Sequence, residues 1–384
     1  MPYAPAAATV RRRPRGWLVG GSAVLLAVLA AAPARAEAPT TAVEPATAAG
    51  RRDLCGRIDA ALAHARDARR LDAGVQGAWQ AVHGILAFGP DFLLTVDGTA
   101  KPATEHLLGG GSLTGWILRP GRQGVVAVVE EGSTMGQGHP DQWLGYLSQC
   151  GVDADGPGGL PLSASLVVAG RPYTLADLLT QAKHDLRPGQ EATWTLMALA
   201  AYLPPDAAWT SGDGDRWDVE RVVAMEAEAE IFEAACGGAH RLYGLAAALV
   251  ARRKAGLPIE PGSGWARAAD VLEDAIDRAR RFQQPDGSFS IHSFERPGTS
   301  PDVFARLGAT GHVFEVIALA LDDDRLAEPW VTRAADRLTS LLEQTADVDV
   351  ECGALYHAAH GLALYRLRTC GSPPGDPAFG RAGE

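Results

Sequence analysis

The sequence lacks the motifs that mark the common nucleotide- and metal-dependent enzymes. It has five cysteines, but no Cys-x-x-Cys pair and no His-Glu-x-x-His motif. It also has no Gly-x-x-x-x-Gly-Lys-[Ser/Thr] phosphate loop, which argues against a nucleotide hydrolase. Beyond the first 36 residues, no apolar run is long enough to span a bilayer.

Positive charge is scarce outside the N-terminal segment. The chain of 384 residues has a formal charge of −11, yet residues 1–36 contain five arginines and no acid. The remainder therefore carries 30 basic residues against 46 acidic ones. Nucleic-acid binding needs a basic stripe that neutralises phosphates, and none is present. We expect neither nucleic acid nor nucleotide as a partner.

Residues 1–36 have the pattern of an export signal. A basic region ends at Arg15, an apolar run extends from Trp17 to Ala32, and Ala34-Arg35-Ala36 is a small-x-small cleavage site. We expect a protein exported to the periplasm, the cell envelope or the medium, with no integral membrane segment after cleavage. An uncleaved anchor is the alternative. Residues 37–50 and 371–384 are rich in Ala, Pro, Gly and Thr and predict a disordered linker and tail.

Six short segments align without gaps, and each continues into a small, apolar run. They begin at Gln80, His139, Glu191, His240, His312 and His357. Apolar character on all sides predicts buried, inner helices. Amphipathic, charged stretches between most of them predict outer helices at 51–72, 174–186, 218–232, 265–284 and 329–344.

Six such hairpins bury every apolar face if they close into a ring. We therefore predict an all-α domain over residues 51–370, an (α/α)6 toroid of six helical hairpins. The second repeat is irregular: it has a short helical candidate near Glu105 to Leu108 and a β-hairpin insertion, pairing 113–118 with 124–130.

The alignment predicts two stacked layers of polar side chains at one mouth of the ring, since positions i and i+3 share a helix face. The upper layer comprises Gln80, His139, Glu191, His240, His312 and His357. The deeper layer comprises His83, Gln142, Trp194, Tyr243, Glu315 and His360. These layers form a polar cup at helix N-termini, whose dipoles favour anions and neutral imidazole.

The cup suggests a metal-assisted enzyme or a binder of a small polar ligand. Zinc or another divalent metal is the candidate cofactor, held by ligands from His240, His312, His357, Cys236 and Cys352. Glu315, Glu191 and His360 are candidate catalytic groups. The candidate ligand-binding residues are His139, Gln142, Trp194, Tyr243 and His83.

Two alternatives remain open. Glu191 and Glu315 are also suited to act as acid and base in a carbohydrate-active lyase or hydrolase, with aromatic residues as a sugar platform. Alternatively, the protein is a non-catalytic envelope scaffold, and its polar layers only fix the geometry of the ring.

Ring closure makes Cys55, which opens the first outer helix, a neighbour of Cys370, which follows the last inner helix. We expect a disulfide between them, worth on the order of 4–5 kcal/mol by the loop-entropy model. Cys150 is expected to be a buried or unpaired thiol.

One turn carries a family resemblance. Gln283-Gln284-Pro285-Asp286-Gly287-Ser288-Phe289 resembles the Q-x-x-D-G-x-W/F turn of the terpenoid cyclase (squalene cyclase)/protein prenyltransferase toroids. The segments Gly136–Gln142, Cys236–His240 and 309–312 are similar to those of uncharacterised exported bacterial toroid proteins. The resemblance implies the toroid fold but no settled reaction, and the Asp-x-Asp-Asp acid of class II terpene cyclases is absent.

Overall fold

The computed structural model describes residues 48–153 and 156–370, which lie in one compact unit. Within these ranges the chain is mostly helical, as predicted, and it also has a few small sheets. The predicted signal peptide and the tail lie outside the described residues. Helix α1 begins at Ala48, so the last three residues of the predicted linker 37–50 are helical.

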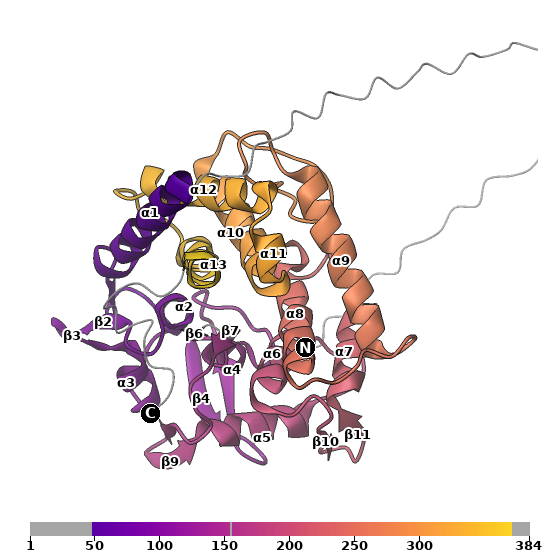
Figure 1. Cartoon of the computed structure of the whole chain (residues 1–384). Helices are drawn as coiled ribbons and strands as arrows, with labels where there is room; N and C mark the ends of the chain where they lie inside the picture. Colours follow the sequence, from indigo (N-terminus) through magenta and orange to yellow (C-terminus); the bar gives the residue numbers. More distant parts are fainter. Residues whose placement is uncertain (1–47, 154–155, 371–384) are drawn as a thin grey trace, which may run out of the picture. The chain divides into compact units, whose positions relative to one another are not determined.

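Six helices form the interior of the unit, and each contacts the next along the chain. They are α2 (Ala78–Phe88), α4 (Gln142–Leu147), α6 (Thr193–Tyr202), α8 (Ala239–Lys254), α10 (Val303–Ala320) and α13 (Cys352–Cys370). Helix α13 also packs against α2, so the sequence of contacts returns to its start. Figure 1 shows these helices surrounded by the others. All six predicted inner segments fall on or directly before them.

Five other helices cover the interior helices from outside (Figure 1). They are α1 (Ala48–Asp67), α5 (Leu175–Asp185), α7 (Val219–Glu228), α9 (Gly264–Phe282) and α12 (Pro329–Gln344). Each occupies one of the five predicted amphipathic stretches. The first turn of α9 is capped by Ser263, whose hydroxyl accepts a hydrogen bond from the backbone N–H of Ala266 at 3.1 Å. Buried Trp265, Leu272 and Ile276 form its inward face.

Short elements fill the connections. The helices α3 (Ala103–Leu108) and α11 (Asp323–Leu326) and the 3-10 helix Ala235–Gly238 each span less than two turns. The predicted hairpin is present as antiparallel β4 (Trp116–Pro120) and β5 (Val125–Val129). The short antiparallel pair of β6 (Gly151–Asp153) and β7 (Gly156–Gly158) follows α4.

Three further antiparallel pairs are present, and neither these nor β6–β7 were predicted. They are β2 (Leu93–Val96) with β3 (Thr99–Pro102), β8 (Ser165–Val168) with β9 (Arg171–Thr174), and β10 (Ala208–Thr210) with β11 (Arg216–Asp218). Strand β1 (Leu71–Asp72) joins β2 in parallel. Asp97 and Gly98 are left-handed, with φ of 50° and 74°, which is the geometry of a two-residue hairpin turn. The Asp97-Gly98 pair therefore indicated a hairpin turn in the sequence, but it was overlooked because the surrounding pattern was interpreted as helical.

The ends of the described chain are joined covalently. Cys55 in α1 and Cys370 in α13 form a disulfide, with 6.0 Å between their Cα atoms, as predicted. Beside it, Arg366 of α13 makes hydrogen bonds of 2.6 and 3.0 Å to Asp59 of α1. Cys150 is a free, buried thiol, also as predicted, and burial raises its pKa to about 12.

Helix α10 packs at the centre of this arrangement, against α8, α12 and α13. Among the described residues it is the one helix long and apolar enough to cross a membrane, but 67% of the apolar window is buried inside the protein. This burial is what a core helix requires. Its contact with α13 is close: a Cβ added at Gly361 would lie 3.0 Å from the Glu315 backbone.

Candidate metal and histidine centre

The deeper polar layer is buried as a set. His83, Gln142, Trp194, Tyr243, Glu315 and His360 are each at most 3% exposed. In the upper layer, His240 and His357 are buried, whereas Gln80, His139, Glu191 and His312 are partly exposed. The predicted polar residues therefore extend from the surface into the interior.

The positions of these residues relative to helix N-termini differ from the prediction. His139 and Glu191 precede α4 and α6, and His240 lies in the first turn of α8. Helix α10, however, begins at Val303, capped by Asp302, so His312 lies nine residues inside it. The helix dipole acts mainly within the first turn, so the predicted dipole effect does not apply to His312.

Four imidazole rings from four inner helices meet at one place. The ring centre of His357 lies 4.3 Å from that of His312, 4.8 Å from that of His240 and 5.1 Å from that of His83. The rings of His240 and His312 are 5.2 Å apart. Residues more than 270 positions apart thus share one cluster.

Cys236 completes a group of three potential metal ligands. The sulfur of Cys236 and one ring nitrogen each of His240 and His312 all lie within 4.8 Å of one another. In the described part of the chain, this is the one group of three Cys, His, Asp or Glu side chains whose ligand atoms are close enough together to hold a metal ion. Of the other two predicted ligands, His357 adjoins the group through its ring, whereas Cys352 does not belong to it. Cys352 lies near Asp349 and Glu351, and burial raises its pKa to about 12.

A turn of three left-handed residues places the Cys236 sulfur. Cys236, Gly237 and Gly238 have φ of 54°, 62° and 85°, directly before α8. A left-handed conformation costs a residue with a Cβ about 1–2 kcal/mol, so packing must hold Cys236 in this position. At Gly238, an added Cβ would lie 2.4 Å from the carbonyl oxygen of Ile231. Glycine is therefore required there.

The Cys236 thiol is in an environment that favours its ionised form. Burial by itself raises the pKa of this thiol, but the charges and hydrogen bonds of His312 and His240 outweigh burial and lower the pKa to about 4. Burial likewise disfavours charge on His312, yet Cys236 and Glu315 raise the pKa of this imidazole to about 9. The two side chains stabilise each other as a thiolate and an imidazolium.

Glu315 holds two histidines of α13. Its oxygens accept hydrogen bonds from Nδ1 of His357 at 2.9 Å and from Nδ1 of His360 at 2.6 Å. These contacts outweigh the effect of burial and lower the Glu315 pKa well below its usual range. Burial lowers the pKa of His357 to about 4, which keeps its ring neutral. The Nε2 atoms of both histidines are buried and have no hydrogen-bond partner among the described residues.

A second histidine–carboxylate pair lies nearer the surface. Nδ1 of His139 is 2.8 Å from Oε2 of Glu191, and both side chains are 27% exposed. The His139 ring stacks on Trp194 at 4.4 Å, and Trp194 contacts His240 at 5.2 Å. The structure therefore brings this pair next to the histidine cluster through one indole ring.

Tyr146 belongs to the cluster but was missed in the sequence. Its ring lies 4.5 Å from that of His83 and 5.9 Å from that of His357. Gln142 donates to its hydroxyl at 3.3 Å. Because Tyr146 is four residues after Gln142, it shares the same helix face. Extending each aligned segment by one turn would have identified it.

The comparisons with known proteins find no similarity: no family model matches this chain, and no curated protein or solved structure matches it.

Proposed function

We propose that the protein is an exported metal-dependent enzyme that holds a divalent ion, zinc by the nature of the donors, at Cys236, His240 and His312. The observation that carries the proposal is the convergence of these three donors within 4.8 Å from two inner helices and a strained turn. A zinc ion with three protein ligands and an open fourth position supplies a Lewis acid and activates water for hydrolysis or lyase chemistry.

The hydrogen bonds behind the ligands support this assignment. Nδ1 of His312 lies 2.8 Å from the Gly308 carbonyl oxygen, to which it donates. Nε2 is therefore the atom that would bind a metal, once the ion has displaced its proton. Glu315 orients His357 in the same way, since the Nδ1–H of the ring donates to the carboxylate. Carbonyl or carboxylate partners of this kind fix the tautomer and orientation of metal-binding histidines. His357 would then serve as a fourth ligand or as a base beside the ion, a role that its ring contact with His312 supports.

The same contacts weigh against a carbohydrate acid–base pair. Both oxygens of Glu315 are engaged by imidazoles, and the residue is 3% exposed. Glu191 is engaged by His139. We therefore assign Glu315 as a positioning residue, whose role is to orient His357 and His360. The exposed His139–Glu191 pair is the group available to a small polar substrate at the mouth of the cup.

The architecture that we propose around this centre is an (α/α)6 toroid, as in the terpenoid cyclase and prenyltransferase superfamily. It is supported by the closed cycle of contacts from α2 through α13 and back to α2. The turn after α9 supports it locally: the Gln283 amide donates to the carbonyl oxygens of Gly287 and Trp330, and Phe289 packs on Trp330. The Cys55–Cys370 disulfide supports export, because disulfides persist in oxidising compartments.

Metal analysis of the purified, full-length protein tests the proposal. After dialysis against zinc, the protein is expected to retain about one equivalent, and His240→Ala and His312→Ala are expected to lose it. His106→Ala, outside the cluster, is the matched control and retains the metal. Glu315→Gln is expected to weaken zinc affinity about 10–100-fold in a chelator competition.

A folded protein that retains no zinc, cobalt or manganese would contradict the metal centre. If His240→Ala and His312→Ala then lowered only the melting temperature, the scaffold alternative would be favoured. Circular dichroism on each variant separates loss of a ligand from loss of the fold.

A further inference from the structure

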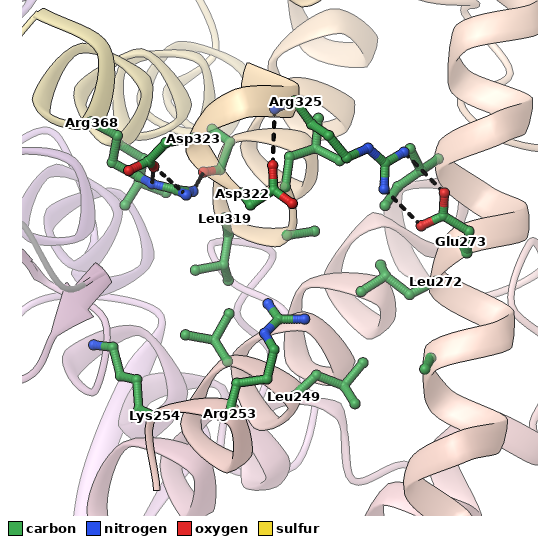
Figure 2. Close-up of a pocket in the computed structure, with 17 residues that line it drawn as sticks. Leu249, Arg253, Lys254, Leu272, Glu273, Leu319, Asp322, Asp323, Arg325 and Arg368 are labelled. Atoms are coloured by element: carbon green, nitrogen blue, oxygen red, sulfur yellow. Dashed lines mark hydrogen bonds and ion pairs between the residues drawn. The ribbon is translucent and has the colours of Figure 1, made fainter. Parts of the chain in front are cut away.

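A cavity lies away from the histidine centre. It occupies about 470 Å³ at the carboxyl ends of α8 and α10, where α9 and α13 also contribute (Figure 2). Arg253 at this cavity follows His240 by 13 residues on α8, which places the two about 20 Å apart along the helix. The cavity is therefore a separate site, of a size that suits a small ligand.

One wall of the cavity is apolar and comes from four helices. Its side chains are Leu249, Leu272, Ile276, Leu319 and Leu364. Each is at most 5% exposed, so the wall is a rigid part of the core rather than a set of mobile surface groups. An alkyl chain lying against this wall would bury mainly its own surface, at about 25 cal/mol for each Å² removed from water.

The cations around this wall fall into two classes. Arg325 makes two hydrogen bonds of 2.9 Å to Glu273, and Arg368 binds Asp323 at 2.7 and 3.0 Å. In the described residues, by contrast, the side chains of Arg253 and Lys254 have no hydrogen bond or ion pair. Figure 2 shows the Arg253 guanidinium extending from α8 into the middle of the cavity.

We propose that this cavity binds a medium-chain fatty acid. The alkyl chain would lie along the leucine wall, and the carboxylate would pair with Arg253 and Lys254. Guanidinium and ammonium groups bind carboxylates through charge-assisted hydrogen bonds. Glu273 and Asp323 of the lining are paired with Arg325 and Arg368, so the Arg253 and Lys254 charges are available to attract an anion.

Calorimetric titration with decanoate, below its micelle concentration, tests the proposal on the full-length protein. We expect saturable binding of one molecule, with affinity that rises from hexanoate to decanoate. Arg253→Gln/Lys254→Gln should weaken binding about ten-fold or more, since a hydrogen bond between charged groups is lost. The control Arg267→Gln/Arg281→Gln changes the charge equally at two exposed positions of α9 outside the cavity.

Basic residues in the last turn of α8 also complement the helix dipole, and the measurements separate this role from ligand binding. Equal decanoate affinity in the two double variants, equal affinity for decyltrimethylammonium, or no dependence on chain length would each overturn the proposal. His240→Ala should leave decanoate binding unchanged, so this test does not depend on the metal centre.

Discussion

At the scale of single residues, the structure separates polar side chains by what surrounds them. Cys236 is kept near imidazoles that stabilise its thiolate, whereas burial alone raises the pKa of Cys150. The sequence distinguished them by position, since Cys236 lies one turn before His240 and Cys150 follows an inner helix, but it did not show the thiolate–imidazole contact. Histidine spacing on α13 did predict that His357 and His360 share a helix face, since they are i and i+3, but not that both bind Glu315. The contact with Cys236 depended on a turn.

Asp141 gives a residue-scale prediction on pH. Burial raises the pKa of its carboxyl group to about 6, against the opposing effect of the Thr195 hydroxyl that donates to it at 2.5 Å. A raised pKa means that the folded state binds the proton more tightly. Asp141 therefore contributes stability below about pH 4, and this contribution is lost as the pH rises through 6.

Asp141→Asn should accordingly stabilise the protein at pH 7, by up to about 3 kcal/mol, and leave stability at pH 4 nearly unchanged. Urea unfolding at both pH values measures this. Asp97→Asn is the control, because Asp97 is also left-handed but exposed, and it should have little effect at either pH. A variant of Asp141 that is destabilised at pH 7 would show that the charged carboxylate is favourable there.

At the scale of elements, the outer helices were predicted within a few residues, because their amphipathic pattern is local and repeats. The inner helices were predicted in order, but α10 begins nine residues before its aligned segment at His312. The hairpins β8–β9 and β10–β11, which lead into α5 and α7, were missed. Strands of three or four residues contain too few alternations to register as a period. The left-handed turn before α8 was also missed, although Cys236-Gly237-Gly238 contained the glycines that it requires.

Gly238→Ala tests the importance of this turn. An alanine Cβ would clash with the Ile231 backbone, so we expect a loss of at least about 3 kcal/mol in unfolding free energy together with weaker zinc binding. Gly256→Ala, after the other end of α8, is the control. It also has positive φ, at 68°, but open space around it, so it should cost only about 1–2 kcal/mol. Equal losses would mean that the contact with Ile231 relaxes freely.

At the scale of the whole described unit, closure depends on contacts between the first helix and the last two long ones. Arg57 of α1 binds Glu343 of α12 at 2.7 and 3.0 Å, and the disulfide joins α1 to α13. The bond spans 315 residues, so it removes much of the freedom of the unfolded chain.

Cys55→Ala/Cys370→Ala should lower the unfolding free energy by about 5–6 kcal/mol on the loop-entropy model for a closure of 315 residues. Guanidinium denaturation of the variant, compared with oxidised and reduced wild-type protein, measures the effect. The reduced wild type should match the variant. If all three unfold at the same midpoint, the ion pairs between α1, α12 and α13 hold these helices together without the bond.

The sequence by itself determined the helical class, the order of inner and outer helices and the polar positions on the inner ones. It could do so because periodicity is a property of neighbouring residues. Only the tertiary structure decided which polar residues meet: Cys236, His240 and His312 converge, whereas Cys352 lies elsewhere. That outcome depends on the left-handed turn before α8, on the start of α10 nine residues ahead of His312, and on the close approach of α10 to Gly361. These are packing relations between distant segments, which a local pattern does not encode.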